Sequence, residues 1–139
     1  MGTVTRPELS KKNRYWIDRH RYYELKHFCL QYQGWKKAYN ELNYSVTRPT
    51  DSVRVFPTND VSDSVAAYVE ERLFYADRIA MIESAARETD PILGSYILMA
   101  VTEGVSYEII KARLDIPCCK DVYYELYRRF FWLLSNMRK

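Results

Sequence analysis

The chain has 139 residues, enough for one domain with a hydrophobic core, and combines 47% hydrophobic with 28% charged residues. Only 4 Gly and 5 Pro are present, which excludes a collagen-like or low-complexity chain. The net charge is +3, but residues 1–48 and 91–139 are basic whereas residues 49–90 are acidic. Two basic ends around an acidic middle favour an anionic partner, with nucleic acid the first candidate.

Neither apolar runs nor cysteines indicate export or a membrane. The longest apolar run, residues 92–101, is too short to span a bilayer, and the N-terminus lacks a hydrophobic signal core. The three cysteines, two of them adjacent, cannot form a disulfide framework. We therefore expect a cytoplasmic protein without a membrane partner.

The N-terminal third of the chain is predicted to be helical. Residues 1–13 are polar and without periodicity, which indicates a solvated arm. A helical pattern begins at Arg14 and is interrupted at Gly34, and a second short helix follows over 35–42. We predict that the two helices form an aromatic hairpin, and that residues 1–45 make one unit with the arm.

A linker and a long helix follow. Residues 46–59 contain two prolines and several Ser, Thr and Asn, which is typical of a linker. Asp60 is a candidate N-cap for a helix that reaches about Thr89, with Arg72 the only charge in a heptad-like apolar seam. Because the apolar arc is wide, we place this helix centrally in the third unit, residues 60–139. The alternative is a homodimer seam.

Three helices are predicted after residue 90. Asp90 is predicted to cap the first and Gly104 to end it, and Ser106 is predicted to cap a short second helix that stops at 115–117. The third runs from about 118 to 137. Its predicted inward stripe consists of Val122, Leu126, Phe130, Leu133 and Met137.

The strings TEGVSYEIIKARLDIP and VYYELYRRFFWLL resemble the helix-turn-helix of sigma-70 region 4 and of phage transcriptional regulators of the ArpU and RinA type. The matching residues are Gly104, Ser106, Glu108, Ile110 and Leu114, whereas Asp115 and Pro117 replace the family's usual Gly and Ser. The string RYYELKHFCLQY is similar to small phage and integrative-element proteins of Firmicutes. The resemblance implies an all-α mobile-element protein in a bacterial host cell, with a C-terminal trihelical helix-turn-helix.

A DNA-binding face follows from this reading. Lys120, Tyr124 and Arg128 recur at i, i+4 and i+8, opposite the apolar stripe, where a recognition helix presents donors to the major groove. The predicted DNA-binding residues are Lys111, Lys120, Tyr124, Tyr127, Arg128 and Arg129. Because Phe131 falls outside the stripe and exceeds what one small core needs, we also predict a homodimer that matches paired half-sites in duplex DNA.

Other functions have less support. A phage inhibitor or adaptor that occupies RNA polymerase or another host protein is the main alternative, and a DNA-packaging factor is a third. Neither a glycine-rich phosphate loop nor a hydrolase motif is present, so we predict no enzyme and no cofactor. His20, His27 and Cys29 lack metal-ligand spacing. Cys118 and Cys119 are interpreted as packing residues, with redox sensing as the alternative because a helix N-terminus lowers a thiol pKa.

Overall fold

A computed structural model describes residues 13–47 and 58–139, with side chains described for 13–44 and 63–139. These residues form α-helices and no strand, which confirms the all-α class. In chain order the helices are α1 (Arg19–Leu30), α2 (Tyr32–Thr47), α3 (Thr58–Thr89), α4 (Gly94–Glu103), α5 (Tyr107–Leu114) and α6 (Lys120–Met137). Within the described ranges, no helix has the length and apolar character needed to cross a membrane.

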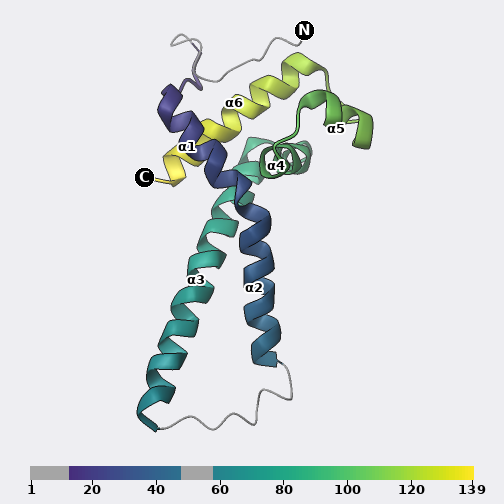
Figure 1. Ribbon diagram of the computed structural model, residues 1–139. Helices are drawn as coiled ribbons and strands as arrows, with labels where there is room; N and C mark the ends of the chain where they lie inside the picture. Colours follow the sequence, from purple (N-terminus) through teal and green to yellow (C-terminus); the bar gives the residue numbers. More distant parts are fainter. Residues whose placement is uncertain (1–12, 48–57) are drawn as a thin grey trace.

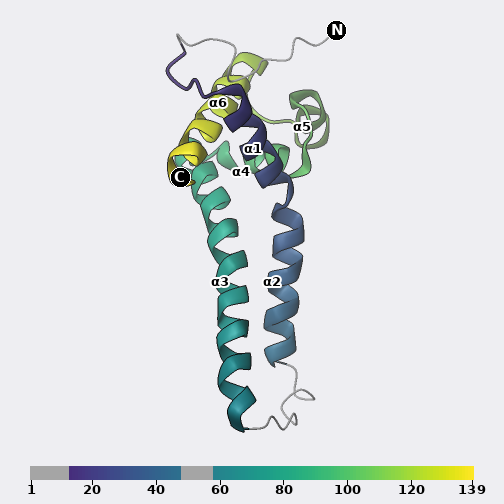
Figure 2. The same cartoon turned by 60° about the vertical axis from the view of Figure 1, so that its left-hand side comes forward.

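The molecule has a head and a two-helix arm (Figures 1 and 2). The head contains α1, α4, α5, α6 and the C-terminal end of α3. The arm consists of α2 and the N-terminal part of α3, which run antiparallel and side by side away from the head. The two ends of the described chain, including the C-terminus, lie in the head.

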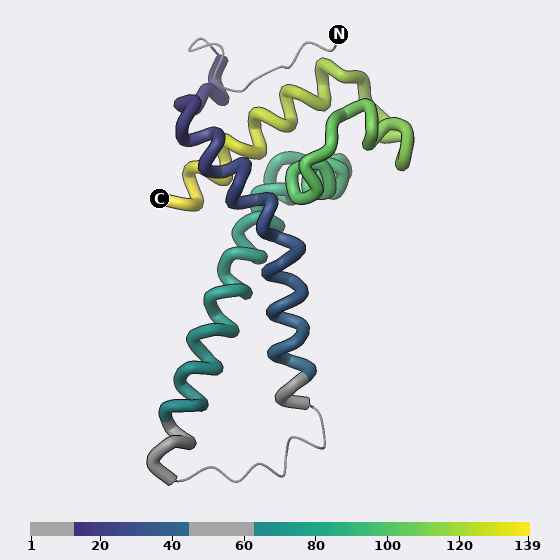
Figure 3. The backbone as a smooth tube through the Cα atoms, viewed as in Figure 1, coloured from purple at the N-terminus to yellow at the C-terminus, as the bar shows by residue number. Residues whose placement is uncertain are grey.

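The first two helices run end to end, and the tube in Figure 3 bends between them without turning back. Only Gln31 separates α1 from α2, and its φ of −85° and ψ of −7° are helical. One residue in this conformation cannot reverse the chain, so the predicted N-terminal hairpin is corrected: α2 pairs with α3 instead. Gly34, predicted to interrupt the helix, lies inside α2. The predicted linker falls mostly on 48–57, outside the described residues.

The long helix predicted from Asp60 corresponds to α3, which begins two residues earlier and ends at Thr89. Its C-terminal part lies in the head, where Ile82, Ala85 and Ala86 are buried. Between residues 63 and 74, however, almost every side chain is exposed. Central placement therefore holds for the C-terminal part only. The rest of α3 has α2 as its neighbour (Figure 2).

The start of α4 is held tightly against the end of α3. Asp90 accepts hydrogen bonds from the backbone N–H groups of Ile92 and Leu93, at 2.8 and 2.7 Å, and so holds the turn before α4. The predicted N-cap role is corrected, because α4 begins at Gly94 and its N-cap residue is Leu93. Gly94 itself is buried. A Cβ on Gly94 would lie 2.2 Å from the carbonyl oxygen of Ala86. Only glycine permits this approach of two backbones.

The buried face of α6 differs from the predicted stripe. Val122 is exposed, and Leu126 and Leu133 are only partly buried. Phe130 is the one member of the predicted stripe that is buried. The other buried residues are Tyr123, Phe131 and Leu134, which place the core side about one residue step around the helix. Phe131 packs edge-on against Tyr22 of α1, with ring centroids 5.1 Å apart. It is therefore not a spare apolar side chain, and its part of the dimer argument is wrong.

Candidate nucleic-acid interface

The α4–α5–α6 segment has local signals that end and begin each helix. Gly104 ends α4 in the left-handed conformation, with φ 70°, and Ser106 caps α5 by accepting from the N–H of Ile109 at 3.4 Å. Asp115 ends α5, also left-handed, at φ 51°. Aspartate tolerates this conformation better than most residues, so Asp115 can end α5 without a glycine.

Lys120 and Glu108 link the first turns of α6 and α5. The Lys120 ammonium donates to the Glu108 carboxylate at 2.8 Å. This hydrogen bond lowers the pKa of Glu108 and raises the pKa of Lys120. The side chains remain 40% and 58% exposed, so water competes for both partners and the ion pair contributes little to stability. Lys120 can exchange Glu108 for another anion.

Lys111 serves the end of its own helix. Its ammonium donates to the carbonyl oxygen of Ile116 at 3.1 Å and lies 3.0 Å from the Asp115 carboxylate. A cation in this position neutralises the C-terminal end of α5. The structure thus gives Lys111 an internal role in the turn before α6.

Tyr127 belongs to an aromatic cluster rather than to an outer face. Its hydroxyl lies 2.7 Å from that of Tyr22 in α1, and its ring packs against Phe131. Burial raises the pKa of Tyr127, and the hydrogen bond with Tyr22 acts in the same direction. Tyr124 is partly buried, with its ring edge-on to Tyr123. Of the two predicted tyrosines, Tyr124 is the more accessible.

Arg128 and Arg129 point back to the protein. The Arg128 side chain is only 18% exposed and lies 3.9 Å from Glu125. Arg129 donates to the carbonyl oxygens of Thr89 at 3.2 Å and Glu88 at 3.1 Å, which are at the C-terminal end of α3. It also donates to the hydroxyl of Tyr15 at 3.2 Å. Arg129 therefore caps α3, whose last carbonyls have no helical partner.

Replacing Arg129 by alanine is expected to destabilise the fold by about 1.5–3 kcal/mol, since charged hydrogen bonds to two helix-terminal carbonyls are lost. Thermal unfolding followed by circular dichroism measures the change. The matched control is Arg87→Ala at the exposed end of α3, where Arg87 donates to Ser84 within the same helix. The control should change stability by less than about 0.5 kcal/mol. Equal effects of the two changes would contradict the capping role.

A cavity of about 230 Å³ lies between α1, the α4–α5 turn and α6. Its walls include four tyrosines and the backbone of Gly104, and Lys26 of α1 lies on its rim beside Ser106 and Tyr124. The tyrosines that line it are Tyr22, Tyr123, Tyr124 and Tyr127. From the sequence pattern we could infer only that Lys26 lies outside the apolar face of α1. That it lies next to the turn before α5 depends on tertiary packing.

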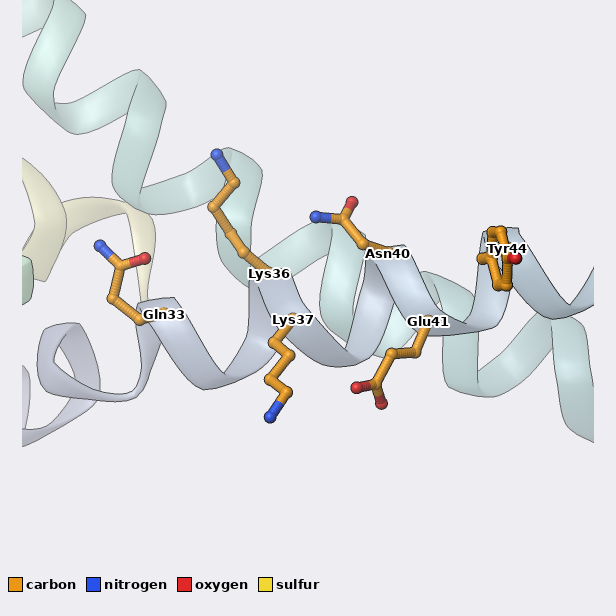
Figure 4. A pocket seen from close by; sticks show the side chains of 6 residues that line it. All are labelled: Gln33, Lys36, Lys37, Asn40, Glu41 and Tyr44. Carbon is orange, nitrogen blue, oxygen red and sulfur yellow. The ribbon is translucent and has the colours of Figure 1, made fainter.

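Other features contribute less to a site. Asp121 and Glu125 are exposed on α6, and their negative charges repel phosphates. The largest hollow, about 770 Å³, is lined by residues of α2 alone, whose side chains spread to different sides of the helix in Figure 4. It is an open flank of the arm.

The cysteines and histidines are dispersed. The described residues contain no group of three His, Cys, Asp or Glu side chains able to hold a metal ion. Burial raises the pKa of the Cys118 thiol, against the lowering expected at a helix N-terminus. That helix begins at Lys120, so Cys118 lies before its first turn. Cys118 therefore lacks the helix N-terminal position on which the redox alternative was based, whereas Cys119 is the exposed N-cap residue of α6, where redox sensing stays a prediction.

Comparison with known proteins finds no matching family model, no matching curated protein and no matching solved structure.

Proposed function

We propose that the chain binds duplex DNA as a transcriptional regulator of a phage or mobile element. The observation that carries the proposal is the start of α6, where the partly exposed Lys120 lies four residues before Tyr124, and Tyr124 lines a cavity together with Lys26 of α1. The first turns of a recognition helix are the part that contacts base edges in helix-turn-helix proteins. The order of α4, α5 and α6 and the short turns between them are compatible with that use.

The proposed contact set is smaller than the one read from the sequence. Tyr124 is assigned to the groove, and Lys120 and Lys26 to neighbouring phosphates. Arg129 and Tyr127 support the proposal only by positioning α6, because their polar groups bind within the head. Arg128 and Lys111 are held in the same way by Glu125 and Asp115. A dimer would present two such surfaces to paired half-sites.

A protein partner is the second candidate function. The exposed carboxylates of Asp121 and Glu125 disfavour phosphates on one side of α6, and the tyrosine-lined cavity has room for an apolar side chain of a partner. Interface energy concentrates in such aromatic pockets. In this reading the chain is an inhibitor or adaptor of a host protein.

Glu108→Gln is the variant that separates these functions most sharply. It removes a carboxylate that competes with phosphate for Lys120, so we expect tighter binding to duplex DNA with little change in thermal stability. Lys120→Ala should weaken binding about tenfold and reduce the slope of log K against log salt by about 0.9. Fluorescence anisotropy with labelled random duplexes at two salt concentrations measures both.

Lys37→Ala is the matched control, because this exposed lysine lies on the flank of the arm (Figure 4). It should leave DNA affinity and salt slope unchanged. If the wild-type protein shows no salt-sensitive DNA binding, or if Glu108→Gln and Lys120→Ala both behave like the control, this surface does not bind DNA. The protein-binding function then takes precedence.

A further inference from the structure

The arm exposes apolar side chains that no described part of the chain covers. Val65, Val69 and Leu73 of α3 are 56%, 45% and 51% exposed. Their spacing of four residues places them on one side of the helix, where they form what we call the arm stripe. Apolar groups gathered in this way are typical of an interaction surface.

The arm stripe continues into the groove between the two helices of the arm. Ala76 and Ala80 extend it toward the head by steps of three and four residues. These two alanines line a hollow of about 300 Å³ together with Lys36 and Asn40 of α2. Small side chains on α3 leave room there for side chains of another helix.

Charges of opposite sign border the arm stripe. On α3, Glu70 and Asp77 are exposed one helical step beyond the apolar positions. On α2, the border is the exposed Lys36, which lines the same hollow as Ala76 and Ala80. Across this face of the arm, the order is therefore a basic edge, an apolar groove and an acidic edge.

From this order we infer that two copies of the chain pair through their arms, face to face, as a four-helix bundle with both heads at the same end. A two-fold axis parallel to the arm sets α2 of each copy against α3 of the other. Each basic edge then lies over the partner's acidic edge, while the apolar groups meet between them. Antiparallel arms would instead oppose the two acidic edges, which is unfavourable.

The pairing does not depend on DNA binding, and its surface shares no residue with the one proposed for DNA. Residues 63–80 of α3 give a face about 27 Å long at 1.5 Å per residue. The stem of Lys36 can cover apolar groups while its ammonium group reaches the partner's carboxylates. A second copy therefore fits both the apolar and the charged parts of the face.

Sedimentation equilibrium across a concentration series tests the inference. The wild-type protein should show twice the 16.6 kDa mass of one chain. Leu73→Glu should raise the dimer dissociation constant about a hundredfold, since the change occurs twice across a two-fold interface and each leucine contributes about tenfold. The control Ile92→Glu changes an apolar residue that is 75% exposed in the head, and should leave the dissociation constant unchanged.

A charge exchange tests the partner and its orientation. Lys36→Glu and Asp77→Lys should each weaken the dimer, and the double variant should recover most of the loss. A wild-type protein that stays monomeric at every concentration overturns the inference. So does a dimer that Leu73→Glu leaves intact, or a double variant no tighter than the weaker single one.

Discussion

Gly94→Ala is expected to lower the free energy of unfolding by about 3 kcal/mol or more, at the top of the usual range for overpacking. The new Cβ would lie 2.2 Å from the carbonyl oxygen and 2.9 Å from the carbonyl carbon of Ala86. Both atoms belong to the α3 backbone, so no side-chain rotation relieves the clash. The α3–α4 junction has to open, and the buried contacts of Ile97 and Ile82 weaken with it.

Thermal unfolding measures the effect, which should appear as a decrease of about 10 °C in the midpoint. Gly34→Ala is the matched control, because Gly34 is exposed in the first turn of α2 and no atom lies within 4 Å of the added Cβ. Alanine is the better helix former by about 1 kcal/mol, so this control should be neutral or stabilising. If the two variants have the same midpoint, the close approach of α3 and α4 is wrong.

Helix ends were predictable because capping is local. Gly104 and Ser106 each act on backbone groups a few residues away, so their residue types were enough to place them. Asp90 acts locally too, but on the turn before α4, so the predicted helix start was too early. The start of α1 shows the limit of this reasoning. Asp18 caps it by accepting from the N–H of His20 at 3.0 Å, four residues after the predicted start at Arg14. A helical pattern alone did not distinguish the two positions.

The buried and exposed faces of α6 were assigned wrongly because a tyrosine side chain combines an apolar ring with a polar hydroxyl. The sequence pattern treated Tyr124 and Tyr127 as outward groups and gave the inward stripe to Val122 and Leu126. A buried tyrosine is stable when its hydroxyl has a partner, and Tyr22, more than 100 residues away, supplies that partner to Tyr127. Long-range pairing of this kind leaves no periodic signal.

Arg129 is a second example from the candidate site. An arginine beside a tyrosine on a terminal helix is typical of a DNA-binding face, and the prediction used that pattern. Its hydrogen bonds go to carbonyls about 40 residues earlier, at the end of α3. The positions that remain accessible, Lys120 and Tyr124, were predicted from spacing. Lys26 was not, because it joins them only through the packing of α1 on α6.

The tyrosine cluster predicts unfolding at alkaline pH. Burial raises the pKa values of Tyr123 and Tyr127 above the ordinary value of about 10, because an ionised phenolate is poorly solvated in the core. Burial also raises the pKa of Tyr32, whose hydroxyl donates to Glu83 at 2.5 Å. The neutral tyrosines therefore contribute their full stability below about pH 10. That contribution is lost as the pH rises through the higher folded-state values.

The raised pKa values of these tyrosines act in the same direction, so their contributions to stability are lost together at alkaline pH. We expect a cooperative loss of helix above about pH 10. Tyrosinate absorbance should rise over the same pH range, at a higher pH than for exposed tyrosines. The double variant Tyr22→Phe/Tyr127→Phe removes both hydroxyls of one hydrogen bond. Removing both partners together should change the stability at pH 7 very little. The midpoint of the alkaline transition should move to a higher pH. Tyr44→Phe, at a residue that is 62% exposed, is the control and should leave the transition in place. An alkaline transition that the double variant does not move would show that ionisation of this pair is not what unfolds the head.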